Sequence, residues 1–199
     1  MAAMTEPDEK PQKPARKIPR RPSPAYLERA ALHYLERFAT SAENLRRVLL
    51  RKIDRAIRHH PDVERDTAAG WVDALILRYQ SAGLLNDQAY AEARATSLHR
   101  RGASPRKIRM NLMLKGVAGE RIDAAMEDLA ERVEGDPELT AAIALARRRR
   151  LGPYRPAEGR ADNHDRDLAT LARNGFSYDI ARRVIEAEDM ATLEEEALE

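Results

Sequence analysis

A pattern of serine, two apolar residues and lysine occurs twice in this sequence. The first copy is Ser41, Leu45, Leu49 and Lys52. The second copy, with identical spacing, is Ser104, Ile108, Leu112 and Lys115. A chain that repeats a helical pattern folds as an array of similar units, each packed on its neighbour, rather than around one central core.

Two further matches extend the repeat along the chain. The end of the second copy has a counterpart nearer the C-terminus, in Leu171, Asn174, Gly175 and Phe176. The helical patterns that follow the first and second copies also agree: Val72, Leu75, Ile76 and Tyr79 match Ile122, Ala125, Met126 and Leu129. The sequence therefore predicts three tandem three-helix units.

Apolar residues recur at helical spacing along nearly the whole chain, and no convincing alternating strand pattern is present. The first helix is predicted from Leu27, Ala31, Tyr34, Leu35 and Phe38. Thr40 with Glu43 forms a possible capping box that opens the second helix, and Ser104-Pro105 is a strong start signal. Asn174-Gly175 is interpreted as a helix stop. We expect an all-α protein of nine helices with an elongated, curved, solenoid-like body.

The two ends differ from this body in composition. Residues 1–24 contain six prolines, six basic side chains and almost no large apolar group, so they are predicted to form a disordered basic arm. Residues 189–199 are expected to form an acidic tail. Between them lie repeat 1 (25–85), repeat 2 (86–134) and repeat 3 (135–188).

The basic side chains are concentrated in the repeats, although 35 basic residues nearly balance 33 acidic ones overall. Three clusters occur in related positions, which favours contact with the phosphates of a nucleic acid. Few aromatic residues accompany them, so contact with the sugar-phosphate backbone is expected rather than reading of bases. The alternative is that each cluster is an ordinary solvated helix face. The candidate contact residues are Arg46, Arg47, Arg51 and Lys52; Arg100, Arg101, Arg106, Lys107, Arg109 and Lys115; and Arg147, Arg148, Arg149 and Arg150.

Signals for catalysis, metal binding or membrane insertion are missing from the sequence. It has no cysteine, no His-Glu-x-x-His motif and no glycine-rich phosphate loop, so neither a cofactor nor a metal site nor an enzyme is expected. The longest apolar run, 141–146, is far shorter than the ~20 residues that span a bilayer. We expect a soluble cytoplasmic protein, without membrane contact, that acts as a monomer.

Three segments of the sequence stand out together. The first is Gly83-Leu84-Leu85-Asn86-Asp87-Gln88-Ala89-Tyr90-Ala91. The second is Arg101-Gly102 with Ile108, Leu112 and Lys115-Gly116-Val117, and the third is Asn174-Gly175-Phe176-Ser177-Tyr178-Asp179. In this order they resemble motifs of the RecX family of regulators of the RecA recombinase. The chain departs from the family where Ile53 follows Lys52, at Ala103 and Ser104 in place of common glycines, and at Asn174 in place of arginine.

The resemblance implies three tandem three-helix repeats and a non-enzymatic function in DNA repair and the SOS response. It implies that the protein lodges in the groove of the RecA–DNA filament and restrains RecA's ATPase and strand exchange. The expected partners are the RecA filament and single- or double-stranded DNA, with the cluster from Arg100 to Lys115 as the central contact. The alternative is a stand-alone, sequence-independent DNA- or RNA-binding module. The acidic tail either shields the basic body or serves solubility.

Overall fold

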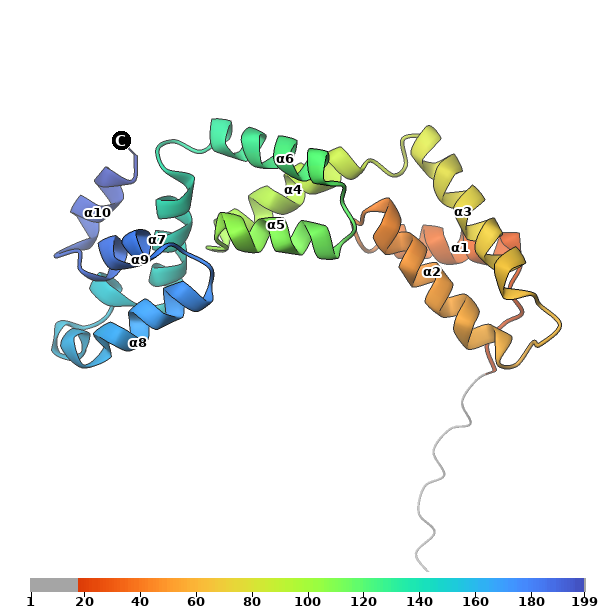
Figure 1. Ribbon diagram of the computed structural model, residues 1–199, viewed down its shortest axis with the longest axis horizontal. Coiled ribbons are helices and arrows are strands. Elements are labelled where there is room, and N and C mark those ends of the chain that lie inside the picture. The colour runs from red at the N-terminus through yellow and green to blue at the C-terminus, as the bar shows by residue number, and fades with distance from the viewer. Residues whose placement is uncertain (1–17, 199) are drawn as a thin grey trace, which may run out of the picture.

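The computed structural model describes residues 18–198, and within them it is all-α, with ten α-helices and two short 3-10 turns (Figure 1). The all-α prediction is confirmed. The helices are α1 (Pro24–Leu35), α2 (Ala42–Ile57), α3 (Arg65–Ser81), α4 (Asp87–Arg100), α5 (Pro105–Leu114), α6 (Gly119–Arg132), α7 (Pro137–Arg149), α8 (Arg160–Arg173), α9 (Tyr178–Ile185) and α10 (Met190–Glu196). The 3-10 turns, η1 (Gly152–Tyr154) and η2 (Ala157–Gly159), lie between α7 and α8.

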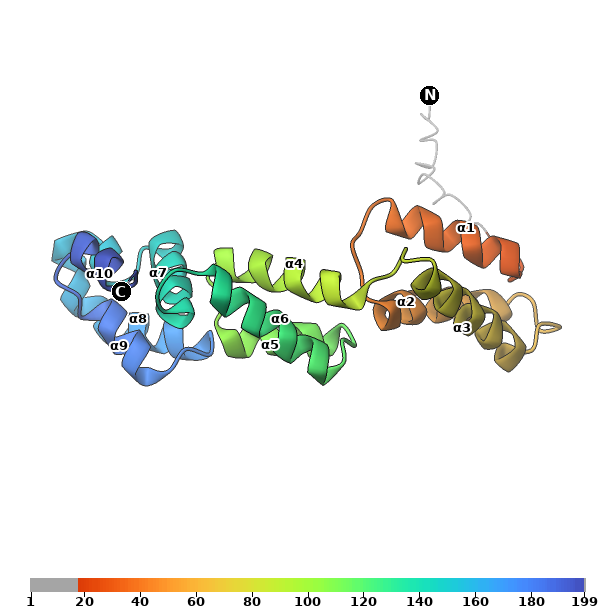
Figure 2. The same ribbon diagram turned by 90° about the horizontal axis from the view of Figure 1, so that it is seen from above.

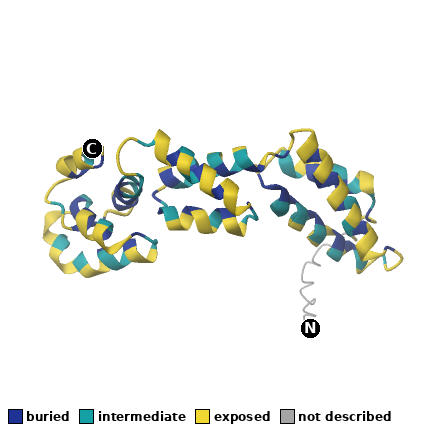
Figure 3. Cartoon of the chain, turned by 45° about the horizontal axis from the view of Figure 1, so that its top comes forward, coloured by how far each residue is buried: buried dark blue, intermediate teal, exposed yellow. Residues whose placement is uncertain are grey.

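The helices form three bundles in a row, so that the molecule is an elongated arch (Figures 1 and 2). Buried apolar residues fall into three separate clusters, one in α1–α3, one in α4–α6 and one in α7–α10. Buried residues lie on the sides of the helices that face one another within each bundle, while the outer helix faces are exposed (Figure 3). A bundle of three helices has a small core, and packing against the adjacent bundles adds to its stability.

Serine side chains begin four of these helices. Ser23, Ser41, Ser104 and Ser177 are N-caps whose hydroxyl oxygens accept hydrogen bonds from backbone N–H groups in the first turn. The prediction of Thr40 as the cap of α2 is wrong by one residue. Thr40 Oγ1 instead accepts a hydrogen bond from the Asn44 side chain at 2.7 Å, which leaves Ser41 to cap the helix.

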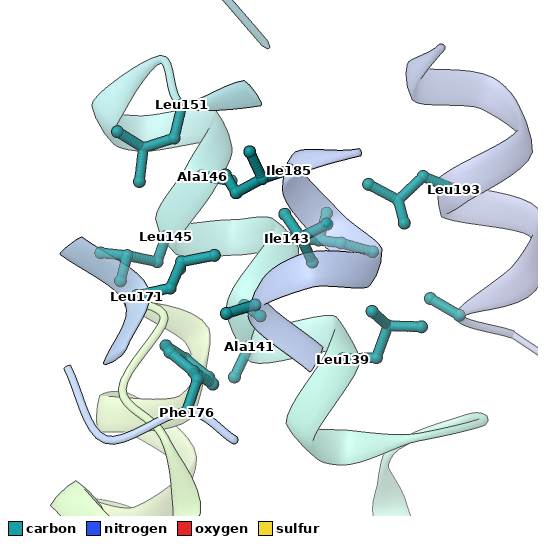
Figure 4. Close-up of a cluster of buried hydrophobic side chains, with 14 residues drawn as sticks. Leu139, Ala141, Ile143, Leu145, Ala146, Leu151, Leu171, Phe176, Ile185 and Leu193 are labelled. Carbon is teal, nitrogen blue, oxygen red and sulfur yellow. The ribbon is translucent and has the colours of Figure 1, made fainter. Parts of the chain in front are cut away.

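The acidic stretch near the C-terminus is folded, in contrast to the tail expected from its charge. Asp189 caps α10 by accepting a hydrogen bond from Thr192 N, and Leu193 is almost fully buried against the third bundle (Figure 4). Glu194 and Glu196 pair with Arg147 and Arg183. Charge count alone missed this tenth helix because neighbouring arginines neutralise its glutamates.

Most of the predicted basic arm, residues 1–17, lies outside the residues that the structure describes. The following segment, 18–23, runs beside the loop between α2 and α3. There the His60 ring nitrogen lies 3.0 Å from the Pro19 carbonyl oxygen, and Arg21 forms a 2.6 Å ion pair with Asp62. These two contacts fix the approach to α1.

Candidate binding surface

The second helices of the three bundles lie end to end in the order α8, α5, α2. Ser104, the N-cap of α5, donates a hydrogen bond of 2.7 Å to the carbonyl oxygen of Asn174, the C-cap of α8. Ser41, the N-cap of α2, donates in the same way to the carbonyl oxygen of Lys115, the C-cap of α5. Each junction therefore joins a helix C-terminus to a helix N-terminus, an arrangement that the helix dipoles favour.

This head-to-tail line forms the lower edge of the arch in Figure 1. Two glycines allow the close approach. Gly175 has a φ of +86°, and a Cβ atom there would lie 2.8 Å from Ser104 Oγ. Gly116 has a φ of +74°, and a Cβ atom there would collide with the Glu43 side chain. The repeated serine and the residue pair Lys-Gly or Asn-Gly thus meet across each junction, which explains their spacing in the sequence.

A buried carboxylate adds a further tie between the first two bundles. Asp87, at the start of α4, accepts a 2.7 Å hydrogen bond from the backbone N–H of Ala42 and lies 3.3 Å from a guanidinium nitrogen of Arg121. At the next junction the residue equivalent to Ala42 is Pro105, which has no N–H to satisfy. The two junctions therefore share a plan but differ in this contact.

Two of the predicted contact arginines form equivalent ion pairs within their own bundles. Arg46 of α2 binds Asp73 of α3 through two hydrogen bonds, and Arg109 of α5 pairs with Asp123 of α6. The hydrogen bond raises the pKa of Arg46 and lowers the pKa of Asp73. These arginines attach the second helix of a repeat to the third.

Four more of the predicted residues contact neighbouring segments. Arg47 donates to the Leu114 carbonyl oxygen at 2.9 Å, and Lys115 Nζ lies 3.3 Å from Asn44 Oδ1, both across the first junction. Lys107 Nζ donates to Asn174 Oδ1 across the second. Arg147 pairs with Glu194 of α10. The run of four arginines at the end of α7 is thereby divided, because Arg147 and Arg148 point to different neighbours.

Three predicted cations do converge on one pocket. Arg101 at the C-cap of α4, Lys107 of α5 and Arg148 of α7 line a hollow of about 290 Å³ where the second and third bundles meet. Asn111 and Asn174 add amide groups, and no acidic side chain lines this pocket. Such a pocket attracts a phosphate or a carboxylate. We call it the cationic pocket.

The six remaining candidates have exposed side chains without an ion pair to any residue in the described range 18–198. They are Arg51, Lys52, Arg100, Arg106, Arg149 and Arg150.

A second hollow, of about 680 Å³, lies between the first and second bundles, and no pattern in the sequence predicts it. Phe38, counted among the core residues of the first helix by its spacing, is 51% exposed and lines this pocket with Leu84 and Arg37. Arg94 also lines it and donates a 3.0 Å hydrogen bond to Asn111 of the cationic pocket. This hydrogen bond between α4 and α5 connects the linings of the two pockets.

Neither a metal site nor a membrane span is evident in the part of the chain that the structure describes. No group of three metal-binding side chains occurs in residues 18–198, and no helix there is long and apolar enough to cross a bilayer. A row of small helical bundles, each with its own buried cluster, defines the molecule as an all-α helical-repeat protein.

Comparison with known proteins gives the family. The model for the second three-helix domain of RecX matches residues 86–126. Regulatory protein RecX of Myxococcus xanthus (strain DK1622) is 48% identical over 172 residues, which cover 86% of this chain and 90% of that protein. Regulatory protein RecX of Agrobacterium fabrum (strain C58 / ATCC 33970) is 30% identical over 171 residues, covering 83% and 88% respectively. No solved structure matches.

The chain belongs to the RecX family of regulatory proteins. Members of this family are regulators rather than enzymes, and membership implies that the protein takes part in regulating RecA.

Proposed function

We propose that this protein binds along the groove of the RecA–DNA filament and restrains RecA's ATPase and strand exchange. The cationic pocket is the observation that carries the proposal, because three cations from three helices face one hollow without an acidic neighbour. The arch supports it, since an elongated row of bundles contacts several successive subunits of a helical filament at once. Several weak contacts along such a row add up through effective concentration.

The contact with DNA is proposed to be independent of base sequence. Arg101, Lys107 and Arg148 are suited to phosphate oxygens, which carry no sequence information. Binding through phosphates releases counterions, so the affinity is expected to fall steeply as salt rises. The second candidate function, a stand-alone DNA- or RNA-binding module, uses the same pocket but needs no recombinase.

The test is a titration of the protein into RecA filaments on single-stranded DNA and into bare single-stranded DNA at one salt concentration. The regulator is supported if filament ATPase falls at protein concentrations well below those that coat bare DNA. Inhibition that follows DNA coating indicates the stand-alone module instead. No effect on the filament at saturating protein rejects the regulatory proposal.

A charge-matched pair of variants assigns the effect to the pocket. In the first variant Arg101, Lys107 and Arg148 are replaced by alanine. In the control, alanine replaces three exposed arginines, one from the third helix of each bundle: Arg78, Arg132 and Arg182. Both variants lose three positive charges, so only a contribution specific to the pocket makes the first one weaker than the control. Equal inhibition by the two variants excludes the pocket as the contact.

A further inference from the structure

The outward face of α5 is apolar, which is unusual for an exposed helix. Met110, Met113 and Leu114 are 50%, 62% and 66% exposed, and their i, i+3, i+4 spacing places them on one face. Ile108 and Leu112 of the same helix are fully buried, so the core is already supplied from the opposite side. Adjacent exposed apolar side chains mark an interaction surface more often than isolated ones do.

Repeat 1 has a different surface at the same positions. With Ser41 aligned on Ser104, Arg47 and Arg51 of α2 occupy the places of Met110 and Leu114. The third equivalent residue, Leu50, is partly buried against the first core rather than exposed as Met113 is. The apolar face of α5 is therefore absent from α2 and does not follow from the repeat itself.

Cations are fixed at both ends of this apolar face. At the C-terminal end, Lys115 Nζ lies 3.3 Å from Asn44 Oδ1. Arg47, whose charge is paired with Glu43, donates to the carbonyl oxygen of Leu114 at 2.9 Å. Lys107 lies at the other end, where its Nζ donates to Asn174 Oδ1. From residue 107 to residue 114 the helix rises about 10 Å. The face thus presents an apolar centre with a positive charge at each end.

We propose that this face of α5 docks on a protein surface, that of a RecA protomer of the filament. The contacted surface of the protomer carries an apolar projection with carboxylates on either side. Charge complementarity is the reason for assigning a protein partner to this face. The apolar centre has no counterpart in the phosphate backbone of a nucleic acid, whereas the flanking cations match acidic side chains. The inference rests on the proposed function and adds which residues recognise protein rather than DNA.

The experiment replaces Met110, Met113 and Leu114 together by glutamine, a residue of similar length and good helix propensity. We expect binding to RecA filaments to weaken about 30-fold, the range of hot-spot residues, with unchanged binding to bare single-stranded DNA. Leu114→Gln and Leu77→Gln form a matched pair, because Leu77 of α3 is also 66% exposed. Only the former is expected to reduce filament binding, and circular dichroism checks that every variant is folded.

The outcomes separate this inference from the proposed function. If the unmodified protein binds filaments and the triple variant binds equally well, the docking face is wrong and the proposed function stands. If the triple variant loses filament and DNA binding in parallel, the face contacts nucleic acid and the protein assignment is wrong. If the unmodified protein fails to bind filaments, both are rejected. Should the triple variant misfold, Met110→Gln alone gives the same decision, with a smaller expected loss.

Discussion

The carboxylate of Asp87 accepts a hydrogen bond from the backbone N–H of Ala42, so the first residue of α4 satisfies the start of α2 in the preceding bundle. The contact is buried, with Asp87 only 8% exposed. It connects a residue of the Gly-Leu-Leu-Asn-Asp motif to the repeated serine segment. The motif is therefore a structural joint between repeats.

Asp87→Ala is expected to destabilise the protein by about 2 kcal/mol, because it leaves a buried N–H without an acceptor. Asp87→Asn retains an oxygen acceptor and should cost less. The midpoint of urea unfolding, at unchanged slope, measures both effects. Equal midpoints for the two variants would mean that the hydrogen bond to Ala42 contributes nothing particular.

Gly102→Ala and Gly83→Ala separate backbone strain from collision. Both glycines have positive φ, +74° and +71°, so an alanine at either position costs about 1–2 kcal/mol in strain. A Cβ atom at Gly102 would also lie 2.5 Å from the backbone nitrogen of Leu145 in α7, while at Gly83 nothing lies within 4 Å.

Gly102→Ala is therefore expected to lower the stability of the protein more than Gly83→Ala does. The additional loss of stability comes from the collision at the junction of the second and third bundles. Thermal unfolding of the two variants provides the comparison. Similar melting temperatures would show that α7 moves away without cost.

Attachment of α10 is expected to weaken in acid. Hydrogen bonds from Tyr154 and Arg147 lower the pKa of Glu194, and burial, together with the hydrogen bond to this carboxylate, raises the pKa of Tyr154 to about 12. Since the folded-state pKa of Glu194 lies below its unfolded value, the stabilisation is present at neutral pH and is lost as the pH falls through the folded pKa.

The effect is expected below about pH 4.3, the ordinary glutamate value. It should stay under about 1 kcal/mol, because Glu194 is 41% exposed. Hydrogen exchange at Leu193 as a function of pH measures it. Glu194→Gln should abolish the acid dependence, and an unchanged pH profile in that variant would assign the effect to another group.

Arg46 and Arg109 are expected to act in the repeats rather than on DNA. Each is bound to an aspartate of the neighbouring helix, but both pairs are exposed, so Arg46→Gln or Arg109→Gln should cost no more than about 1 kcal/mol of stability. The salt dependence of DNA binding should not change in either variant, because an arginine that is bound to an aspartate does not contact a phosphate. A shallower slope of log affinity against log salt concentration in a variant would show that the replaced arginine does contact a phosphate.

Sequence periodicity identifies the helices and the repeat because both depend on local spacing. The glycine stops and serine caps act within a few residues of themselves, and their roles at α5 and α9 follow from the sequence alone. α10 was missed because its glutamates are neutralised by Arg147 of α7 and Arg183 of α9, which lie outside the acidic stretch.

The candidate site was harder to predict because the charge of a side chain does not tell which neighbour the side chain points to. Arg147 and Arg148 are adjacent in sequence, yet one binds α10 and the other lines the cationic pocket. Asp87 and Asn174 act through contacts with residues 45 and 70 positions away, which no local pattern reveals. The exposed Met110 and Met113 fit the apolar pattern of a helix core, and only the packing shows that they are outside it.

The ten residues of α5 set the separation of the two head-to-tail junctions, since the helix is joined to a neighbour at each end. At 1.5 Å per residue its length is about 15 Å, and each added residue would also rotate one end by about 100° relative to the other. A single insertion in α5 would therefore misalign the whole arch with any periodic partner. The number of residues in the middle helix thus sets both the distance between the neighbouring bundles and their relative rotation about the helix axis.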